Sequence, residues 1–201
     1  MIMKPNAAKL RITIEGINPA PWREIEIRVS SSLKMLHDTL QAAFLWQNTH
    51  LWEFEVDGKR YGTDFCIAEG DDIGRAQTMR IAKIVENDVK KFTYIYDFGD
   101  HWVHTIEILS LFYTEDNVRL PRFVSGEYAA PPENIGGIPG YEYFLDKILK
   151  NPKHPERENY EHFINDALFG IFDPEEVKPE LINIFIKRIA RAKSQSKTSQ
   201  S

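Results

Sequence analysis

Two stretches near the N-terminus alternate strictly between apolar and polar side chains. In residues 9–16 every second position from Leu10 to Ile14 is apolar, and residues 22–29 repeat the pattern from Ile25 onward. A period of two with one apolar side is typical of half-buried strands. The connecting residues 16–21 include a glycine and two prolines, which is a turn composition. The two stretches are therefore predicted to form an antiparallel hairpin.

The rest of the chain supplies further strands first and helices later. A helix is predicted over 32–46, where Ser32 can cap a run of leucines at helical spacing. The other expected elements are strands at 50–56, 59–61, 92–96 and 102–108, a short helix at 79–86, loops at 62–78 and 114–140, and helices beginning near 139, at 155–169 and at 174–189. This order predicts an α+β fold. We expect a mainly antiparallel sheet of about five or six strands, with helices packed on one face and a helical C-terminal part.

Charge is distributed unevenly along the chain. The net charge is −5, but residues 187–201 hold five basic residues and no acidic residue, which leaves −10 for residues 1–186. We expect a single domain over 1–190 and a basic, Ser-rich, flexible tail over 191–201. An acidic domain repels a phosphate backbone, so only the tail is a candidate for contact with nucleic acid.

The cysteine content and the hydropathy of the chain bear on its location. Cys66 is the single cysteine, so no internal disulfide can form, which suits a reducing cytoplasm. No stretch approaches the ~20 apolar residues that a membrane span needs. A cytoplasmic protein without a membrane partner is therefore predicted.

The run from Tyr94 to His104 gathers carboxylates, imidazoles and aromatic rings around one predicted turn. Strands usually avoid Asp, and turns usually avoid Trp and Phe, so this hairpin is either a buried polar scaffold or a site. Alternation places His104 on the apolar side of its strand, where Asp97 or Asp100 could orient one ring nitrogen. A core histidine bonded to a carboxylate or a carbonyl group is the more frequent arrangement.

These residue types also predict a metal or ligand site. Imidazoles and carboxylates bind Zn²⁺ or harder divalent ions, and the candidate metal ligands are His50, Asp97, Asp100 and His104. Glu133 follows the rigid pair Pro131-Pro132, which fixes its position, and it is the candidate catalytic general base. The predicted binding residues are Tyr96, Asp97, Asp100, Trp102, His104, Glu133 and Asn134.

Several motifs together resemble the plasmid open-reading-frame-three-like proteins, a family named after a product of an agrobacterial root-inducing plasmid. The motifs are Pro21-Trp22-Arg23, Leu36-His37, Trp46, His50-Leu51, the run Tyr94–His104, Pro131–Gly137, Gly140-Tyr141 and Phe172-Asp173-Pro174. The resemblance covers roughly residues 9–180. It implies an α+β fold, a prokaryotic setting linked to mobile elements, and a polar centre of His50, Asp97, Asp100, His104 and Glu133. It implies no particular activity, because the family is functionally uncharacterised.

The chain departs from the family pattern at one position in the proline-rich loop. The family often has Asp after Pro-Pro-Glu, and this chain has Asn134 there. An amide can coordinate or hydrogen-bond but brings no negative charge, which weakens a metal site at that loop.

The leading prediction is a binding or interaction domain without enzymatic activity. Its expected contact surface is the Tyr94–His104 hairpin together with the 126–141 loop, and its expected partner is a protein or a small ligand. One alternative is a metal-dependent hydrolase, in which a divalent metal is the cofactor and Glu133 activates a bound water. A second alternative is a nucleic-acid-associated accessory protein that uses the basic tail.

Overall fold

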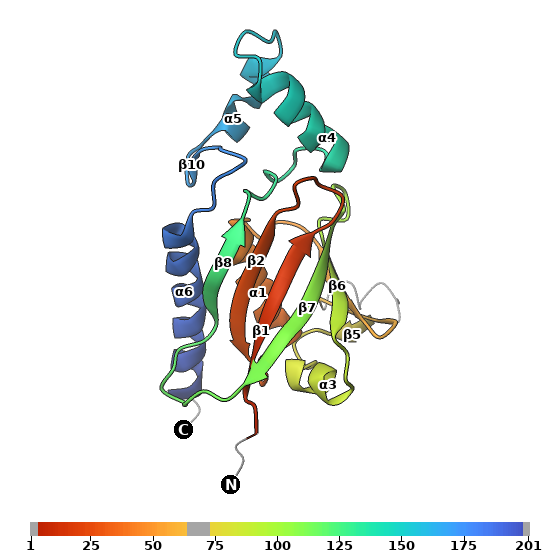
Figure 1. Cartoon of the computed structure of the whole chain (residues 1–201), viewed down its shortest axis with the longest axis vertical. Coiled ribbons are helices and arrows are strands. Elements are labelled where there is room, and N and C mark those ends of the chain that lie inside the picture. Colours follow the sequence, from red (N-terminus) through yellow and green to blue (C-terminus); the bar gives the residue numbers. More distant parts are fainter. Residues whose placement is uncertain (1–3, 64–72, 199–201) are drawn as a thin grey trace.

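A computed structural model describes residues 4–63 and 73–198 of the chain. Its centre is an eight-stranded sheet in the order β5-β4-β3-β6-β7-β1-β2-β8 (Figure 1). The strands are β1 (Ala7–Ile14), β2 (Trp22–Arg28), β3 (Trp52–Val56), β4 (Lys59–Gly62), β5 (Ile73–Arg75), β6 (Lys91–Tyr96), β7 (Trp102–Phe112) and β8 (Arg122–Glu127). Neighbouring strands run antiparallel except β4 and β5, which are parallel, so the sheet is mixed.

One side of the sheet is apolar because alternating positions of neighbouring strands meet in register. Leu10 of β1 pairs with Ile25 of β2, and both are fully buried. Helix α1 (Leu33–Phe44) covers this side and lies behind the sheet in Figure 1. Ser32 Oγ accepts a hydrogen bond from Met35 N at 3.2 Å and caps the helix. The hairpin and the first helix therefore form where the sequence predicts them.

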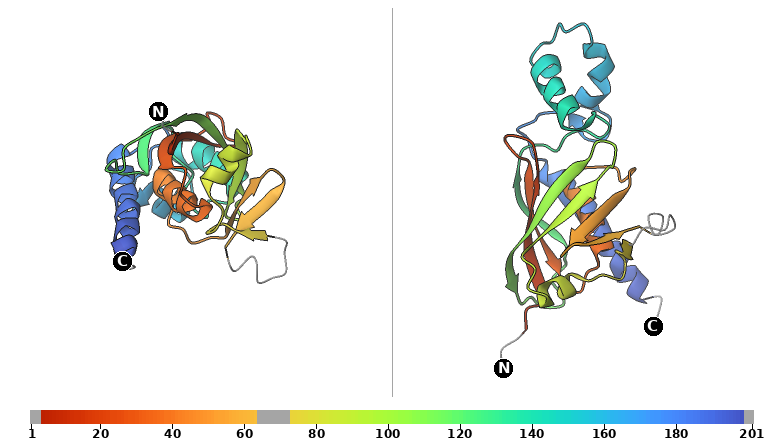
Figure 2. Two further views of the ribbon diagram at one scale, coloured as in Figure 1. Left: turned by 90° about the horizontal axis from the view of Figure 1, so that it is seen from below. Right: turned by 90° about the vertical axis from the view of Figure 1, so that its right-hand side faces the viewer.

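After β8 the chain leaves the sheet and builds a group of short elements beyond one end of it (Figure 2). They are α4 (Gly137–Tyr143), the π-helical segment η1 (Phe144–Leu149), the 3₁₀ turn η2 (Arg157–Tyr160), α5 (Glu161–Ile164) and the hairpin of β9 (Asn165–Asp166) and β10 (Gly170–Ile171). Helix α6 (Pro179–Thr198) then returns beside β8 (Figure 1). Ile182 and Ile186 of α6 are buried against Ala42 of α1.

The predicted number of strands, five or six, is wrong because two strands lie in segments that were expected to be loops. Strand β5 falls within 62–78, and strand β8 falls within 114–140. Both lie at the edges of the sheet. Strand β5 has three residues, and no residue of β8 is fully buried. An edge strand that buries so little leaves no period-two pattern of apolar residues to detect.

The prediction of a helical C-terminal part is also wrong. The helix expected over 155–169 is replaced by η2, α5 and the first strand of the β9–β10 hairpin. Asp166 interrupts it, because its Oδ1 accepts hydrogen bonds from Leu168 N at 2.7 Å and Phe169 N at 2.8 Å. Local bonds of this kind offer the backbone an alternative to the helix.

Three further expectations concern the domain boundary, the single cysteine and membrane spans. The division into a domain over 1–190 and a tail over 191–201 stays a prediction; α6 continues to Thr198, and no side chain beyond Arg191 is described. Cys66 lies outside the described residues. Within the described ranges, no helix combines the length and the apolar composition that a membrane crossing requires.

Candidate functional site

The hairpin of β6 and β7 turns several of its aromatic and imidazole side chains inward rather than outward. Tyr94 pairs with His104, and Tyr96 pairs with Trp102, across the two strands. All four side chains are at most 1% exposed and belong to the core under α1. The aromatic residues that were predicted to contact a ligand are therefore packed inside the protein.

His104 is a buried, neutral histidine. Its Nδ1 lies 3.0 Å from the carbonyl oxygen of Trp102 and 3.2 Å from that of Tyr94, so this nitrogen carries the proton and donates. Burial lowers the pKa of His104 to about 4. Its Nε2 has no hydrogen-bond partner within the described residues. The ring packs against Phe44 and Trp46, so its surroundings are aromatic.

The turn between the strands is held by Asp97. This residue has φ of 57°, and its Oδ1 accepts hydrogen bonds from Gly99 N at 2.9 Å and Asp100 N at 3.3 Å. Its Oδ2 lies 3.4 Å from Nε2 of His50. Asp tolerates the left-handed conformation and accepts bonds from the next backbone amides. Asp97 therefore determines the shape of the turn.

Two other carboxylates connect this hairpin to the proline-rich loop. Asp100 Oδ2 accepts a hydrogen bond from Gly136 N at 3.2 Å. Glu133 accepts one from Gln47 N at 2.8 Å and a second, short one from the hydroxyl of Tyr96. Burial, together with the Glu133 carboxylate, raises the pKa of Tyr96 well above its ordinary value, so the hydroxyl stays protonated and donates.

The predicted site residues thus form separate pairs rather than one shared centre. His50 meets Asp97 and Tyr96 meets Glu133, whereas Asp100 bonds to a main-chain amide and His104 lies in the core. Trp102 is buried there too, and its Nε1 has no hydrogen-bond partner in the described part of the chain. Asn134 is exposed in a left-handed turn, with φ of 63°.

The predicted metal ligands do not assemble. Over residues 4–63 and 73–198, no group of three or more His, Cys, Asp or Glu side chains is placed to hold a metal ion. The basic side chains at 193 and 197, on which the nucleic-acid alternative depends, lie outside the described side chains.

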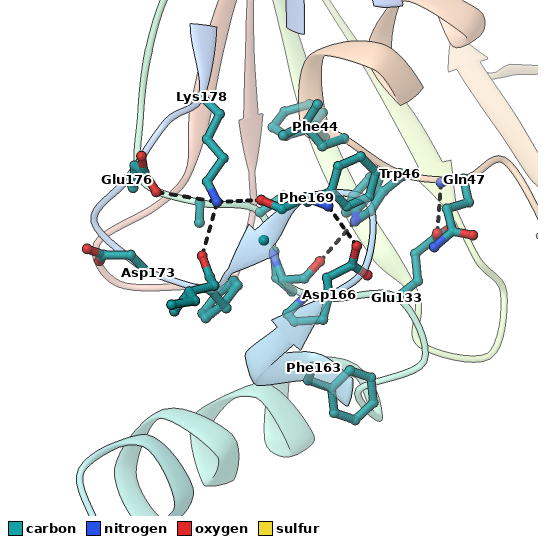
Figure 3. Close-up of a pocket in the computed structure, with 18 of the residues that line it drawn as sticks. Phe44, Trp46, Gln47, Glu133, Phe163, Asp166, Phe169, Asp173, Glu176 and Lys178 are labelled. Carbon is teal, nitrogen blue, oxygen red and sulfur yellow. Dashed lines mark hydrogen bonds and ion pairs between the residues drawn. The ribbon is translucent and has the colours of Figure 1, made fainter. Parts of the chain in front are cut away.

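A cavity of about 170 Å³ lies on the other side of the proline-rich loop (Figure 3). Its walls come from the end of α1 and the segment after it, from the 129–133 loop, and from the 162–178 segment. Figure 3 shows Phe44 and Trp46 on one side and Phe163 on the opposite side. Glu133 is the predicted site residue that lines this cavity.

Most polar groups around the cavity are already bonded within the protein. Asp166 accepts the two amide bonds of its turn, and Asp173 accepts a bond from Glu175 N at 2.9 Å. Lys178 Nζ donates to the carbonyl oxygens of Phe169 at 2.6 Å and Ile171 at 3.0 Å, and it lies 3.4 Å from a Glu176 oxygen (Figure 3). These bonds fix the β9–β10 hairpin as a wall of the cavity.

Arg23 of β2 also lines the cavity, and its side chain is 3% exposed. Its Nε donates to the carbonyl oxygen of Ala43 at 2.9 Å. Its Nη1 lies 2.7 to 3.0 Å from the carbonyl oxygens of Trp22, Glu127 and Tyr128. No carboxylate within the described residues forms an ion pair with this guanidinium. Burial lowers the pKa of Arg23 to about 9.

Arg23 is not among the site residues predicted from the sequence, although its position in the sequence pattern is unusual. Residues 22–29 alternate between the two faces of the strand, and Arg23 lies on the same inward face as Ile25 and Ile27. A charged residue at an inward position of a half-buried strand is unusual.

Comparisons with known proteins place the chain among relatives of unknown activity. A family model described as plasmid pRiA4b ORF-3-like protein matches residues 6–181. The uncharacterized protein y4hQ of Sinorhizobium fredii is 30% identical over 152 residues, which are 76% of this chain and 77% of that protein. The crystal structure of the protein of unknown function MM3350 from Methanosarcina mazei matches with a TM-score of 0.76 and 29% identity, over 89% of this chain and 98% of that chain.

Proposed function

The chain belongs to the plasmid pRiA4b ORF-3-like family, and from that premise we propose that it is a binding protein that holds a small, largely apolar molecule in the cavity between the 129–133 loop and the 162–178 segment. The resemblance that the sequence motifs indicated is thereby confirmed. The two relatives described above carry no assigned activity, so the proposal depends on the geometry of this chain.

The single observation that carries the proposal is the size and lining of the cavity. Its volume of about 170 Å³ exceeds the ~150 Å³ that suffices to bind a benzene ring in an apolar protein cavity. Apolar side chains, among them the rings of Phe44, Trp46 and Phe169, form the larger part of the wall, and polar groups lie among them. Apolar walls with converging polar groups are usual in sites for small molecules. The apolar rings supply the affinity, and the polar groups orient the occupant.

The hairpin and the 126–141 loop take different parts in this proposal. The loop contributes residues 129–133 directly to the cavity wall. The hairpin supports the loop from behind, because Tyr96 bonds to Glu133 and Asp100 bonds to Gly136. We therefore assign the hairpin a positioning role and the loop a contact role.

Binding of single-ring probes to the full-length chain tests the proposal. Benzyl alcohol and benzamide are small enough for the cavity, and we expect both to bind, as measured by ligand-observed NMR titration. Phe169→Ala removes a ring from the wall and should weaken both probes by about tenfold, since a lost ring contact of about 1.4 kcal/mol corresponds to that factor.

Leu168→Ala is the matched control for this variant. Leu168 is the neighbouring residue, is 65% exposed and does not line the cavity. Its truncation should leave both affinities within twofold of the wild type. Absence of binding by either probe, or equal losses in the two variants, would contradict the proposed function.

A further inference from the structure

We propose that the occupant of this cavity carries a carboxylate, and that Nη2 of Arg23 is the group that binds it. This inference rests on the proposed function and adds the chemical class of the ligand, which is an apolar or aromatic acid. It follows from two features of Arg23: its guanidinium is bonded to neutral carbonyl oxygens, and its Nη2 has no acceptor among the described residues.

The guanidinium is immobilised by neutral acceptors only. Nε donates to the carbonyl oxygen of Ala43 at the end of α1. Nη1 donates to carbonyl oxygens of β2 and of the chain leaving β8. These bonds fix the plane of the group, but carbonyl dipoles do not cancel a full positive charge. The Phe44 ring lies under the group, with the guanidinium carbon 5.1 Å from the ring centre.

Nη2 is the nitrogen that the protein leaves without an acceptor among the described residues. A buried charge without a counter-ion is unfavourable, and it becomes acceptable when a partner of opposite sign reaches it. Arg23 lines the cavity, so the nearest space for such a partner is the cavity itself. One N–H···O⁻ bond to a carboxylate would be charge-assisted and would orient the ligand.

The other charged groups around the cavity have partners of their own. The carboxylates of Glu133, Asp166 and Asp173 keep their negative charge, but each accepts bonds from backbone amides and none forms an ion pair with Arg23. The ammonium group of Lys178 is shared by two carbonyl oxygens and Glu176. Among the lining residues described, Arg23 is the cation, at neutral pH, that has no carboxylate within ion-pair distance.

Affinities of two isosteric probes separate this inference from the proposed function. Benzoate and benzamide have almost the same shape, and only benzoate carries a charge. We expect the wild-type chain to bind benzoate about tenfold more tightly, and Arg23→Gln to bring the two affinities within twofold of each other. Equal affinities in the wild type would overturn the inference but leave the proposed function intact. Failure of both benzoate and benzamide to bind would contradict the inference and the proposed function together.

Arg28→Gln is the matched control, because it makes the same charge change on the same strand. Arg28 also donates only to carbonyl oxygens, those of Thr114, Glu115 and Val118, and it does not line the cavity. The preference for benzoate should persist in this variant, and its loss would show that general charge, not Arg23, causes the preference.

A measurement on the unmodified chain covers the case in which Arg23→Gln does not fold. The ¹⁵N resonances of the Arg23 guanidinium, assigned with selectively labelled arginine, should shift clearly more at saturating benzoate than at saturating benzamide. An unmoved resonance at saturating benzoate would overturn the assignment to Arg23.

Discussion

The β6–β7 hairpin and the cavity are neighbours, yet their charged side chains differ in whether the protein supplies them with suitable partners. In the hairpin, Asp97 and Asp100 satisfy backbone amides, and Tyr96 donates to Glu133. Beside the cavity, the buried guanidinium of Arg23 is bonded only to carbonyl oxygens. The carboxylates of the hairpin all have donors within the protein, although Trp102 Nε1 and His104 Nε2 have no hydrogen-bond partner among the described residues. Beside the cavity, a full positive charge is left unbalanced. An unbalanced charge, rather than unusual residue types, is therefore what favours the cavity over the hairpin as the candidate site.

The largest effect that this comparison predicts is on stability and concerns Trp102. If the hairpin is scaffold, Trp102→Ala should lower the free energy of unfolding by about 3–5 kcal/mol, as large-to-small changes in a core do. The side chain is 1% exposed, whereas Phe98 in the same turn is 41% exposed. Phe98→Ala, measured beside it by urea denaturation, should cost less than about 0.5 kcal/mol. Comparable losses of unfolding free energy in the two variants would contradict the interpretation of the hairpin as scaffold.

An intermediate effect is expected on lowering the pH, through the two buried histidines. Burial lowers the pKa of His37 to about 3 and that of His104 to about 4, whereas unfolded histidine titrates near 6.5. The unfolded chain therefore takes up protons first, and stability is lost as the pH falls below about 6.5. Each histidine contributes a slope of about 1.4 kcal/mol per pH unit, or roughly 2 kcal/mol between pH 6.5 and 5.

Urea denaturation at several pH values between 7 and 5 measures this slope. His104→Gln should lower stability throughout and should make the slope shallower by one histidine's share. A slope unchanged by the substitution would show that His104 takes up its proton in the folded state as readily as in the unfolded one.

The smallest effect concerns the connection between the two regions. Tyr96→Phe removes the hydroxyl that donates to Glu133 and accepts from Thr49 N at 3.1 Å. We expect a loss of about 1 kcal/mol in stability, the usual worth of one such bond. Glu133 keeps its bond from Gln47 N, and Asp100 keeps its bond from Gly136 N, so the loop should stay in position and benzamide affinity should change less than twofold. A tenfold loss of affinity would mean that the Tyr96–Glu133 bond alone positions the loop.

The sequence predicted the parts of the fold whose signal is local. The alternation in residues 9–16 and 22–29 and the capped leucine stripe of 32–46 produce β1, β2 and α1. Strands β5 and β8 were missed because an edge strand buries too little to leave a pattern. The hairpin at β9–β10 was missed because the Asp166 turn interrupts an apolar spacing that also suits a helix.

The candidate site was harder to predict, because it depends on contacts between distant segments. The sequence pointed to Glu133 and to the 126–141 loop, and both border the cavity. It gave no indication that the 162–178 segment would face them. Arg23 carried a local signal, an inward position on β2, but its missing counter-ion becomes visible only when all its neighbours are in place.

The cavity wall is built from segments that are far apart in the sequence. Ala129 N donates to the Pro174 carbonyl oxygen at 2.9 Å, which joins two of the segments that face each other. Because β2, α1, the 129–133 loop and the 162–178 segment all contribute to the lining, the cavity exists only when all of them are folded together. A ligand bound there would therefore stabilise the fully folded chain over partly folded forms.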